Sequence, residues 1–186
     1  MKKLCILLIL ASFCFSLRAA ETIPFVCSFE KEGDLENWET YNRDDDEECW
    51  FHGKSDMGGW GAQSLASANN APTDNWLVSP AIHFNEGGRY QLSFMVYTAY
   101  YCVEKMQVTI GTQPEPESQV TILQDIVIPQ VKGYYGYKVS VLLSDINEGD
   151  YHIGLRYYTD ATNTMLVTVR DFSISTVTNG NVAGVV

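Results

Sequence analysis

The sequence predicts an all-β domain, a β-sandwich of the jelly-roll type, and three observations support this prediction. Hydrophobic and polar residues alternate over many short segments, turn-forming residues separate these segments, and no segment keeps a helical period for long. Alternation with a period of two indicates a strand with one buried face. Many short strands at this spacing are typical of a sandwich or a jelly roll.

The expected strands can be followed in chain order. They cover 25–30, 75–84 with a break at Pro80, 89–98, 104–112, 119–128, 137–146, 151–159 and 165–175. The segment 151–159 shows the alternation clearly, because Ile153, Leu155 and Tyr157 fall on one face and Arg156 on the other. Gly, Pro, Asn and Asp residues mark the turns between the strands. The segment 31–75 is polar and rich in Gly and acidic residues, so we expect a long connection there that is functional or ordered by a ligand.

The N-terminus has the features of a secretory signal peptide. Lys2 and Lys3 precede an apolar run over 4–15, and Ala19 and Ala20 offer small residues for cleavage. The run is too short for a comfortable membrane span. The predicted organisation is a signal peptide over 1–20, a jelly-roll domain over 21–176 and a flexible C-terminal tail over 177–186. The protein is therefore expected to be secreted or displayed on the cell surface, without membrane insertion after signal removal.

Charge and cysteine content narrow the choice of partners. The chain has 23 acidic residues against 12 Lys and Arg, and three of those 12 fall in the signal peptide. Such an excess of negative charge repels nucleic acid and anionic membranes. Cys27, Cys49 and Cys102 remain after cleavage, an odd number. Buried free thiols are expected, with a Cys27–Cys49 disulfide as the alternative in an oxidising compartment.

The sequence contains no recognisable catalytic motif. His52, His83 and His152 lie in unrelated segments, and there is no Gly-x-Ser-x-Gly turn, His-Glu-x-x-His motif or phosphate-binding glycine loop. A triad can still be assembled in space, and folding could bring Asp125 or Asp160 opposite another carboxylate, as in a glycosidase. We expect that the protein is not an enzyme.

Aromatic residues are the candidates for ligand contact, because aromatic faces stack on sugars and Tyr adds a hydroxyl. The predicted ligand-binding residues are Trp60, Tyr97, Tyr100, Tyr101, Tyr134, Tyr135 and Tyr137, which would lie at loop ends of the sandwich. Trp38, Trp50 and Trp76 adjoin apolar strands and are expected in the core.

Several motifs together resemble a known family. These are Phe29-Glu30, "GAQSLAS" at 61–67, "DNWLVSPAI" at 74–82, "GGRYQLSFMV" at 87–96 and "VRDFSIS" at 169–175. They resemble the cleaved-adhesin, or choice-of-anchor J, domains of secreted Bacteroidetes proteins, including the adhesin domains attached to gingipain proteases. MAM-type jelly rolls are more distant relatives. The resemblance implies a calcium-supported jelly roll that binds partners and lacks catalysis.

The acidic run at 44–48 fits a calcium site, since calcium takes six to eight oxygen ligands. The expected ligands are Glu30, Asp44, Asp46 and Asp171; the alternative is a solvated acidic loop without an ion. The predicted function is adhesin-type binding, with calcium, to a host or bacterial surface glycoprotein or glycan. The alternatives are a carbohydrate-binding module of a polysaccharide-utilisation system and a secreted hydrolase on a jelly-roll scaffold.

Overall fold

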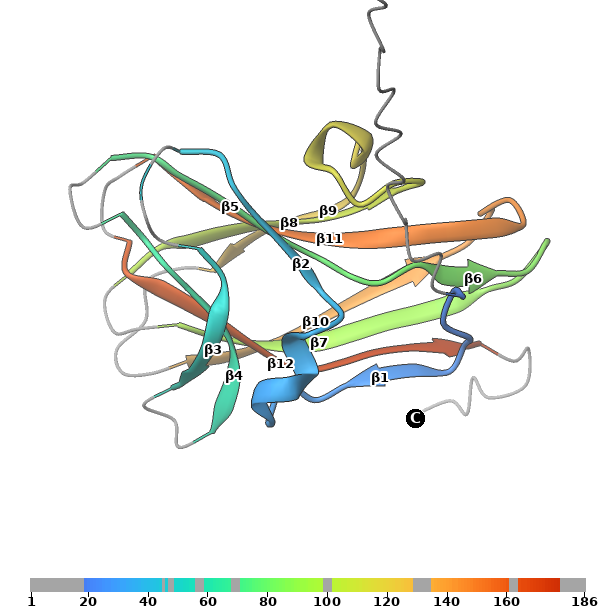
Figure 1. Ribbon diagram of the computed structural model, residues 1–186, viewed down its shortest axis with the longest axis horizontal. Coiled ribbons are helices and arrows are strands. Elements are labelled where there is room, and N and C mark those ends of the chain that lie inside the picture. Colours follow the sequence, from blue (N-terminus) through green and yellow to red (C-terminus); the bar gives the residue numbers. More distant parts are fainter. Residues whose placement is uncertain are drawn as a thin grey trace, which may run out of the picture.

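Two antiparallel β-sheets face each other in the computed structural model (Figure 1), which confirms the predicted β-sandwich. The structure describes residues 19–44, 46, 49–55, 59–67, 71–98, 102–128, 135–160 and 164–177. The strands are β1 (Phe25–Cys27), β2 (Glu39–Asn42), β3 (Phe51–Lys54), β4 (Trp60–Leu65), β5 (Thr73–Val78), β6 (Ile82–Phe84), β7 (Tyr90–Thr98), β8 (Glu104–Gly111), β9 (Thr121–Ile128), β10 (Tyr135–Leu143), β11 (Gly149–Thr159) and β12 (Leu166–Thr176). Two short 3-10 helices, η1 (Glu32–Leu35) and η2 (Pro116–Ser118), lie in the connections.

The two sheets are named here after their central strands. The β12 sheet has the order β10-β7-β12-β4-β3, and β1 pairs with the other half of β12. The β11 sheet has the order β2-β5-β11-β8-β9, and β6 pairs with the start of β11. Neighbouring strands are antiparallel in both sheets. The order mixes strands from distant parts of the chain, as expected for a jelly roll.

The core lies between the sheets, where the predicted alternation places it. Leu92, Phe94 and Val96 of β7 are buried against Leu155 and other residues of the β11 sheet. An aromatic cluster closes one side of the core: the ring centroids of Phe29 and Trp38 are 4.9 Å apart, and those of Trp38 and Phe172 are 5.1 Å apart. Edge-to-face pairs of this kind stabilise a core beyond the area that they bury. Trp38 and Trp50 are core residues, as predicted.

A carboxylate is also fully enclosed in the sandwich. Glu104, at the start of β8, has an exposed fraction of 0%. The Tyr157 hydroxyl donates to Glu104 Oε2 at 2.8 Å, and the backbone N–H groups of Met165 and Leu166 donate to Oε1 at 2.9 and 3.2 Å. Burial raises the pKa of Glu104, while its three donors act in the opposite direction. This side chain therefore ties β8 and β11 to the segment that enters β12.

The segment 31–75 corrects the sequence prediction. It was expected to be a long connection, but it contains η1, β2, β3, β4 and the start of β5. These strands are short, and β4 carries Gln63 and Ser64, which are buried and hydrogen-bonded although they are polar. The hydrophobic alternation that marks the other strands is therefore missing from β4. Pairing with β12, and not side-chain pattern, defines this strand.

The three described cysteines are free thiols. Burial raises the pKa of Cys27 to about 11, and it also raises the pKa of Cys49 and Cys102. These side chains are therefore neutral near pH 7 and are poor nucleophiles. Within the described residues, no helix has the length and apolar character needed to cross a membrane.

Candidate ligand-binding site

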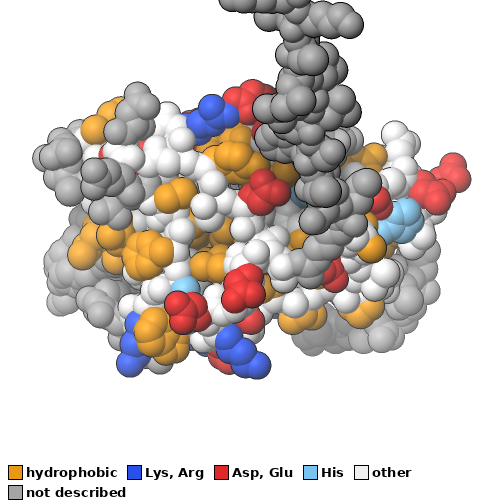
Figure 2. Space-filling model, viewed as in Figure 1, with side chains coloured by type: hydrophobic (Ala, Val, Ile, Leu, Met, Phe, Trp, Pro, Cys, Tyr) orange, Lys and Arg blue, Asp and Glu red, His pale blue; other side chains and the backbone are white. Residues whose placement is uncertain are grey.

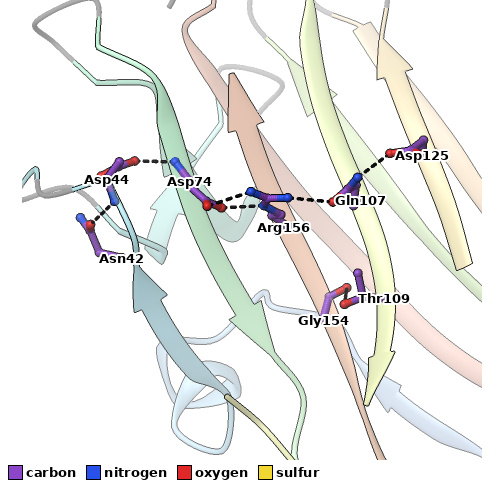
Figure 3. Close-up of polar contacts among 8 residues, drawn as sticks. All are labelled: Asn42, Asp44, Asp74, Gln107, Thr109, Asp125, Gly154 and Arg156. Carbon is purple, nitrogen blue, oxygen red and sulfur yellow. Dashed lines mark hydrogen bonds and ion pairs between the residues drawn. The ribbon is translucent and has the colours of Figure 1, made fainter. Parts of the chain in front are cut away.

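A row of polar side chains crosses the outer face of the β11 sheet (Figure 3). Arg156 on β11 is the register partner of Trp76 on β5 and of Gln107 on β8, and Gln107 is the partner of Asp125 on β9. Because paired residues of adjacent strands point to the same face, these four side chains form one row. The inner face of the same strands is apolar, so the fold itself places the row outside.

Arg156 is the centre of this row. Its Nε and Nη2 donate to the two carboxylate oxygens of Asp74 at 2.6 and 2.8 Å, and its Nη1 donates to Gln107 Oε1 at 3.1 Å. Gln107 Nε2 in turn donates to Asp125 Oδ1 at 2.8 Å. The contacts with Asp74 raise the pKa of Arg156. A two-pronged pair between a guanidinium and a carboxylate fixes both orientation and charge, so the planar groups are held in place before any ligand arrives.

Two aromatic rings flank the guanidinium. The Arg156 Cζ lies 5.1 Å from the ring centre of Trp76 and 5.2 Å from that of Tyr158, within the range of cation–π contact. Trp76 is buried, as predicted, but it lies on the outer face of β5 and outside the main core cluster. Its indole N–H has no partner among the described residues. We call Asp74, Trp76, Gln107, Asp125, Arg156 and Tyr158 the Arg156 platform.

The acidic turn after β2 supports the platform from one side. Asp44 Oδ2 accepts the backbone N–H of Asp74 at 2.5 Å, and the backbone N–H of Asp44 donates to Asn42 Oδ1 at 3.1 Å. The backbone N–H of Asp46 donates to Asp44 Oδ1 at 3.4 Å. Burial raises the pKa of Asp44, and the neighbouring Asp46 carboxylate adds to this effect. The turn therefore anchors the strand that carries Asp74.

The loop between β8 and β9 covers the neighbouring part of the same face. Thr109 Oγ1 donates to the buried Gln119 at 3.1 Å. A β-carbon on Gly154 would lie only 2.4 Å from Thr109 Oγ1, so the loop packs closely here because residue 154 has no side chain. Glu117 of η2 also forms an ion pair with Arg43, just after β2. The loop thus borders the Arg156 platform and leaves the platform itself open.

The open part of the platform offers both hydrogen-bond donors and hydrogen-bond acceptors. Within the described residues three of the five N–H donors of Arg156 are used, which leaves two for a ligand. The side chains of Arg156 and Asp74 are 29% and 28% exposed, and Asp125 is exposed. Donors, acceptors and an aromatic ring on a flat rigid surface suit a polyhydroxylated ligand.

Among the aromatic residues predicted to contact a ligand, the side chains of Trp60, Tyr97 and Tyr137 are described, and they do not share one face. Tyr97 pairs with Gly136 and Thr168 and points outward from the β12 sheet, where Arg170 lies 5.8 Å from its ring centre. Tyr137 packs against the core on the other side of that sheet. Trp60 is 47% exposed and stacks on His52 with ring centroids 4.8 Å apart. Tyr100, Tyr101, Tyr134 and the side chain of Tyr135 lie outside the described residues.

The predicted calcium ligands are only partly brought together. Asp44 and Asp46 share the turn after β2, whereas Glu30 accepts a hydrogen bond from Arg170 at 3.1 Å, and Asp171 is exposed with a φ of 55°. In the described part of the chain, no group of three or more His, Cys, Asp or Glu side chains is placed to hold a metal ion. The oxygen donors described at the acidic turn therefore fall short of a calcium shell. Asp45, Glu47 and Glu48 lie outside the described residues, and calcium binding stays a prediction.

His152 and His83 contact a backbone carbonyl and an exposed carboxylate, respectively. His152 Nδ1 lies 2.8 Å from the backbone carbonyl of Ser79, and the Ser79 hydroxyl donates to the carbonyl of Pro80. His83 Nδ1 contacts the exposed Asp150 at 2.7 Å. Asp125 and Asp160, the carboxylates considered for a glycosidase, are bound to Gln107 and Lys105, respectively. These contacts give each of these four side chains a partner within the fold.

Sequence reasoning missed the Arg156 platform, although one signal was present. The alternation in β11 placed Arg156 outward, but the register that joins it to Asp74 and Gln107 depends on pairing between strands that are far apart in the chain. A charged residue at the centre of a strand, flanked by Tyr157 and Tyr158, could have marked the position. Its partners could not be read from the sequence.

Comparison with solved structures places this geometry in context. The K1 cleaved adhesin domain of Lys-gingipain from Porphyromonas gingivalis W83 superposes with a TM-score of 0.67 at 17% identity, over 83% of this chain and 98% of that one. The fold is shared with the cleaved adhesin domains. This confirms the resemblance predicted from the sequence at the level of the fold. No protein-family model and no curated protein sequence matches the chain.

Carbohydrate-binding modules share the same architecture. TmCBM61, solved in complex with β-1,4-galactotriose, has a TM-score of 0.53 at 10% identity, over 81% of this chain and 95% of that one. The CBM22-1–GH10 modules of Clostridium thermocellum xylanase 10B, complexed with xylohexaose, have a TM-score of 0.54 at 14% identity, over 86% of this chain and 29% of that one. At these identities the likeness shows a common fold, and function has to be argued from the site.

Proposed function

We propose that this protein is a non-catalytic, secreted or surface-displayed binding domain that holds neutral glycans on the Arg156 platform. The observation that carries the proposal is the fixed Arg156 guanidinium, held by Asp74 and Gln107 between the rings of Trp76 and Tyr158. Sugar hydroxyls both donate and accept hydrogen bonds, and the platform offers both donors and acceptors on rigid strands.

The charge around the platform favours a neutral ligand over an acidic one. Within the described residues, Lys105 is paired with Asp160 and Arg43 with Glu117, so Arg156 faces the carboxylates of Asp44, Asp74 and Asp125. A sulfated or uronic-acid glycan would meet this excess of carboxylates and be repelled at low salt. Neutral sugar hydroxyls carry no such penalty and can accept from Arg156 and donate to Asp125.

The neighbours in fold space support this proposal in general terms, since they include adhesin domains and modules solved with oligosaccharides. If the glycan belongs to a host or bacterial surface glycoprotein, binding it would serve adhesion and would also be carbohydrate binding. A carbohydrate-binding module that serves a polysaccharide-degrading system would use the same platform. The two differ in the source of the glycan, and the platform chemistry is common to both.

Calorimetric titration with β-1,4-galactotriose and xylohexaose tests the proposal. We expect binding of at least one of these neutral oligosaccharides, and at least a tenfold loss of affinity, about 1.4 kcal/mol, for Arg156→Gln. The matched control is Arg170→Gln, which removes an ion-paired arginine from the other sheet. Thermal melting verifies that both variants are folded. Equal affinity in the two variants, or binding of neither glycan by the wild type, would contradict the proposal.

A further inference from the structure

A pocket of about 350 Å³ lies at the open side of the sandwich, away from the Arg156 platform. It is bounded by β1, by the η1 region and by Pro80 in the connection between β5 and β6. Figure 2 shows acidic, basic and hydrophobic side chains on the face of the molecule that it views. The volume is at the lower end of the range for small-molecule sites.

The walls of the pocket are aromatic. Phe25 and Trp38 both line it, with ring centroids 6.4 Å apart and planes tilted by 42°. Trp38 is held from behind by Phe29 and Phe172 and is therefore a fixed surface. Aromatic faces carry partial negative charge and attract cations within about 6 Å.

The rim of the pocket is anionic. Glu21 and Asp34 line it together with the polar side chains of Ser28 and Asn37, and none of the described lining residues is Lys or Arg. The Ser28 hydroxyl and the backbone N–H of Lys31 both donate to Asp34 Oδ2, at 2.9 and 3.3 Å, so Oδ1 has capacity for a ligand. These contacts fix the carboxylate at the mouth without neutralising it.

Glu21 is also fixed in place. Its backbone N–H donates to the carbonyl of Ala81 at 2.8 Å, and its carbonyl accepts the N–H of His83 at 2.9 Å. Residue 21 is therefore tied to the start of β6, next to Pro80. Cleavage of a signal peptide before Glu21 would leave its carboxylate in the chain and would place the new α-ammonium group on the same residue, so Asp34 supplies the net negative charge of the rim.

We infer that this pocket binds an organic cation, the side chain of a Lys or Arg residue from a peptide or protein partner. The aromatic walls of Phe25 and Trp38 take the alkyl stem, and the Asp34 carboxylate binds the ammonium or guanidinium head. A volume of about 350 Å³ accommodates one long side chain. The excess of acidic residues, 23 against 12 Lys and Arg in the full chain, steers a basic partner toward the domain.

The chemistry of the pocket argues against a covalent ligand. Cys27 also lines it, but burial raises the pKa of this thiol to about 11, so it stays protonated near neutral pH. The pocket also differs from the Arg156 platform, which is flat and has a cation at its centre. The two sites are therefore suited to different ligands and can be tested separately.

Titration with Nα-acetyl-lysine amide, which keeps the side-chain ammonium group, tests the inference. Binding is followed by ¹⁵N–¹H NMR of the chain that begins at Glu21. We expect saturable shifts at the Trp38 indole and at β1, with similar shifts for N-acetyl-arginine amide. The neutral analogue N-acetyl-norleucine amide should bind at least tenfold more weakly. Binding should weaken at high salt, because the rim carboxylates are near the surface.

Asp34→Asn is the deciding variant, because an asparagine oxygen can still accept from Ser28 and Lys31. We expect at least a fivefold loss of lysine affinity. Asp150→Asn, which removes an exposed carboxylate near His83, is the matched control and should bind as the wild type does. Equal binding of the norleucine analogue, or unchanged lysine affinity in Asp34→Asn, would overturn the inference.

Discussion

Glu104 and Arg156 both connect strands of the β11 sheet with a charged side chain, but on opposite faces. Glu104 points into the sandwich, is 0% exposed and accepts three hydrogen bonds. Arg156 lies on the outer face, is 29% exposed and keeps two N–H donors for a ligand within the described residues. Both side chains therefore join strands, Glu104 inside the fold and Arg156 on the surface where we propose that a glycan binds.

The difference follows from access to water. A buried polar group that loses its partner keeps the full cost of desolvation, whereas an exposed one regains water. Glu104 has no route to a ligand, so its contacts can only hold the fold. The platform is bordered by the β8–β9 loop but not covered by it.

The largest effect is expected for Glu104→Leu. The change leaves the Tyr157 hydroxyl and the N–H groups of Met165 and Leu166 buried without an acceptor, which costs about 3 kcal/mol in the free energy of unfolding. Urea denaturation measures it. The control is Glu30→Leu, which removes an exposed carboxylate with one arginine partner and should cost less than about 1 kcal/mol. Equal stability of the two variants would show that the buried contacts of Glu104 contribute no more to the free energy of unfolding than an exposed ion pair does.

A smaller effect is expected for Glu104→Gln, and it depends on pH. Burial raises the pKa of Glu104 above its ordinary value of 4.5, so the folded chain holds this proton more tightly than the unfolded chain does. The stability from this group is complete below about pH 4.5 and is lost as pH rises through the raised pKa.

Glutamine keeps an oxygen for the two N–H donors and has no charge to desolvate. Unfolding of Glu104→Gln, measured across this pH range, should therefore lack the loss of stability that the wild type shows on going up in pH. The variant should also keep its affinity for glycans, because residue 104 is on the inner face. If the free energy of unfolding changed with pH in the same way in both proteins, Glu104 would not be the source of the pH dependence.

The smallest effect is expected from calcium at the acidic turn of Asp44 and Asp46, which borders the platform. If this turn binds calcium, the ion stabilises the fold by about 0.8 kcal/mol at three times its Kd, through preferential binding to the folded state. Thermal melting with calcium and with a chelator measures it, and Asp44→Asn should abolish the difference. A melting temperature that chelation leaves unchanged would reject the calcium site.

The sequence predicts the fold well because hydrophobic alternation is a local signal. The predicted bounds of β7, β8 and β11 agree with the structure to within two residues at each end. The same alternation correctly places Arg156 on the outer face and Tyr157 on the inner face. It fails at β4, where Gln63 and Ser64 are buried through hydrogen bonds that come from β12 and β5. It also fails at the platform, because Asp74 and Arg156 are separated by 82 residues and meet only through strand pairing.

The central claim is that a neutral glycan binds on the Arg156 platform. It is tested most directly by mapping the backbone N–H groups that the glycan perturbs. Titration of the ¹⁵N-labelled domain with the better-binding of β-1,4-galactotriose and xylohexaose, followed by NMR, reports this for every N–H group. We expect chemical-shift changes that saturate together at residues 74–76, 107, 125 and 156–158. We expect no changes on the outer face of the β12 sheet around Tyr97. Shifts centred on Tyr97 or on Trp60, with the platform unmoved, would contradict the claim.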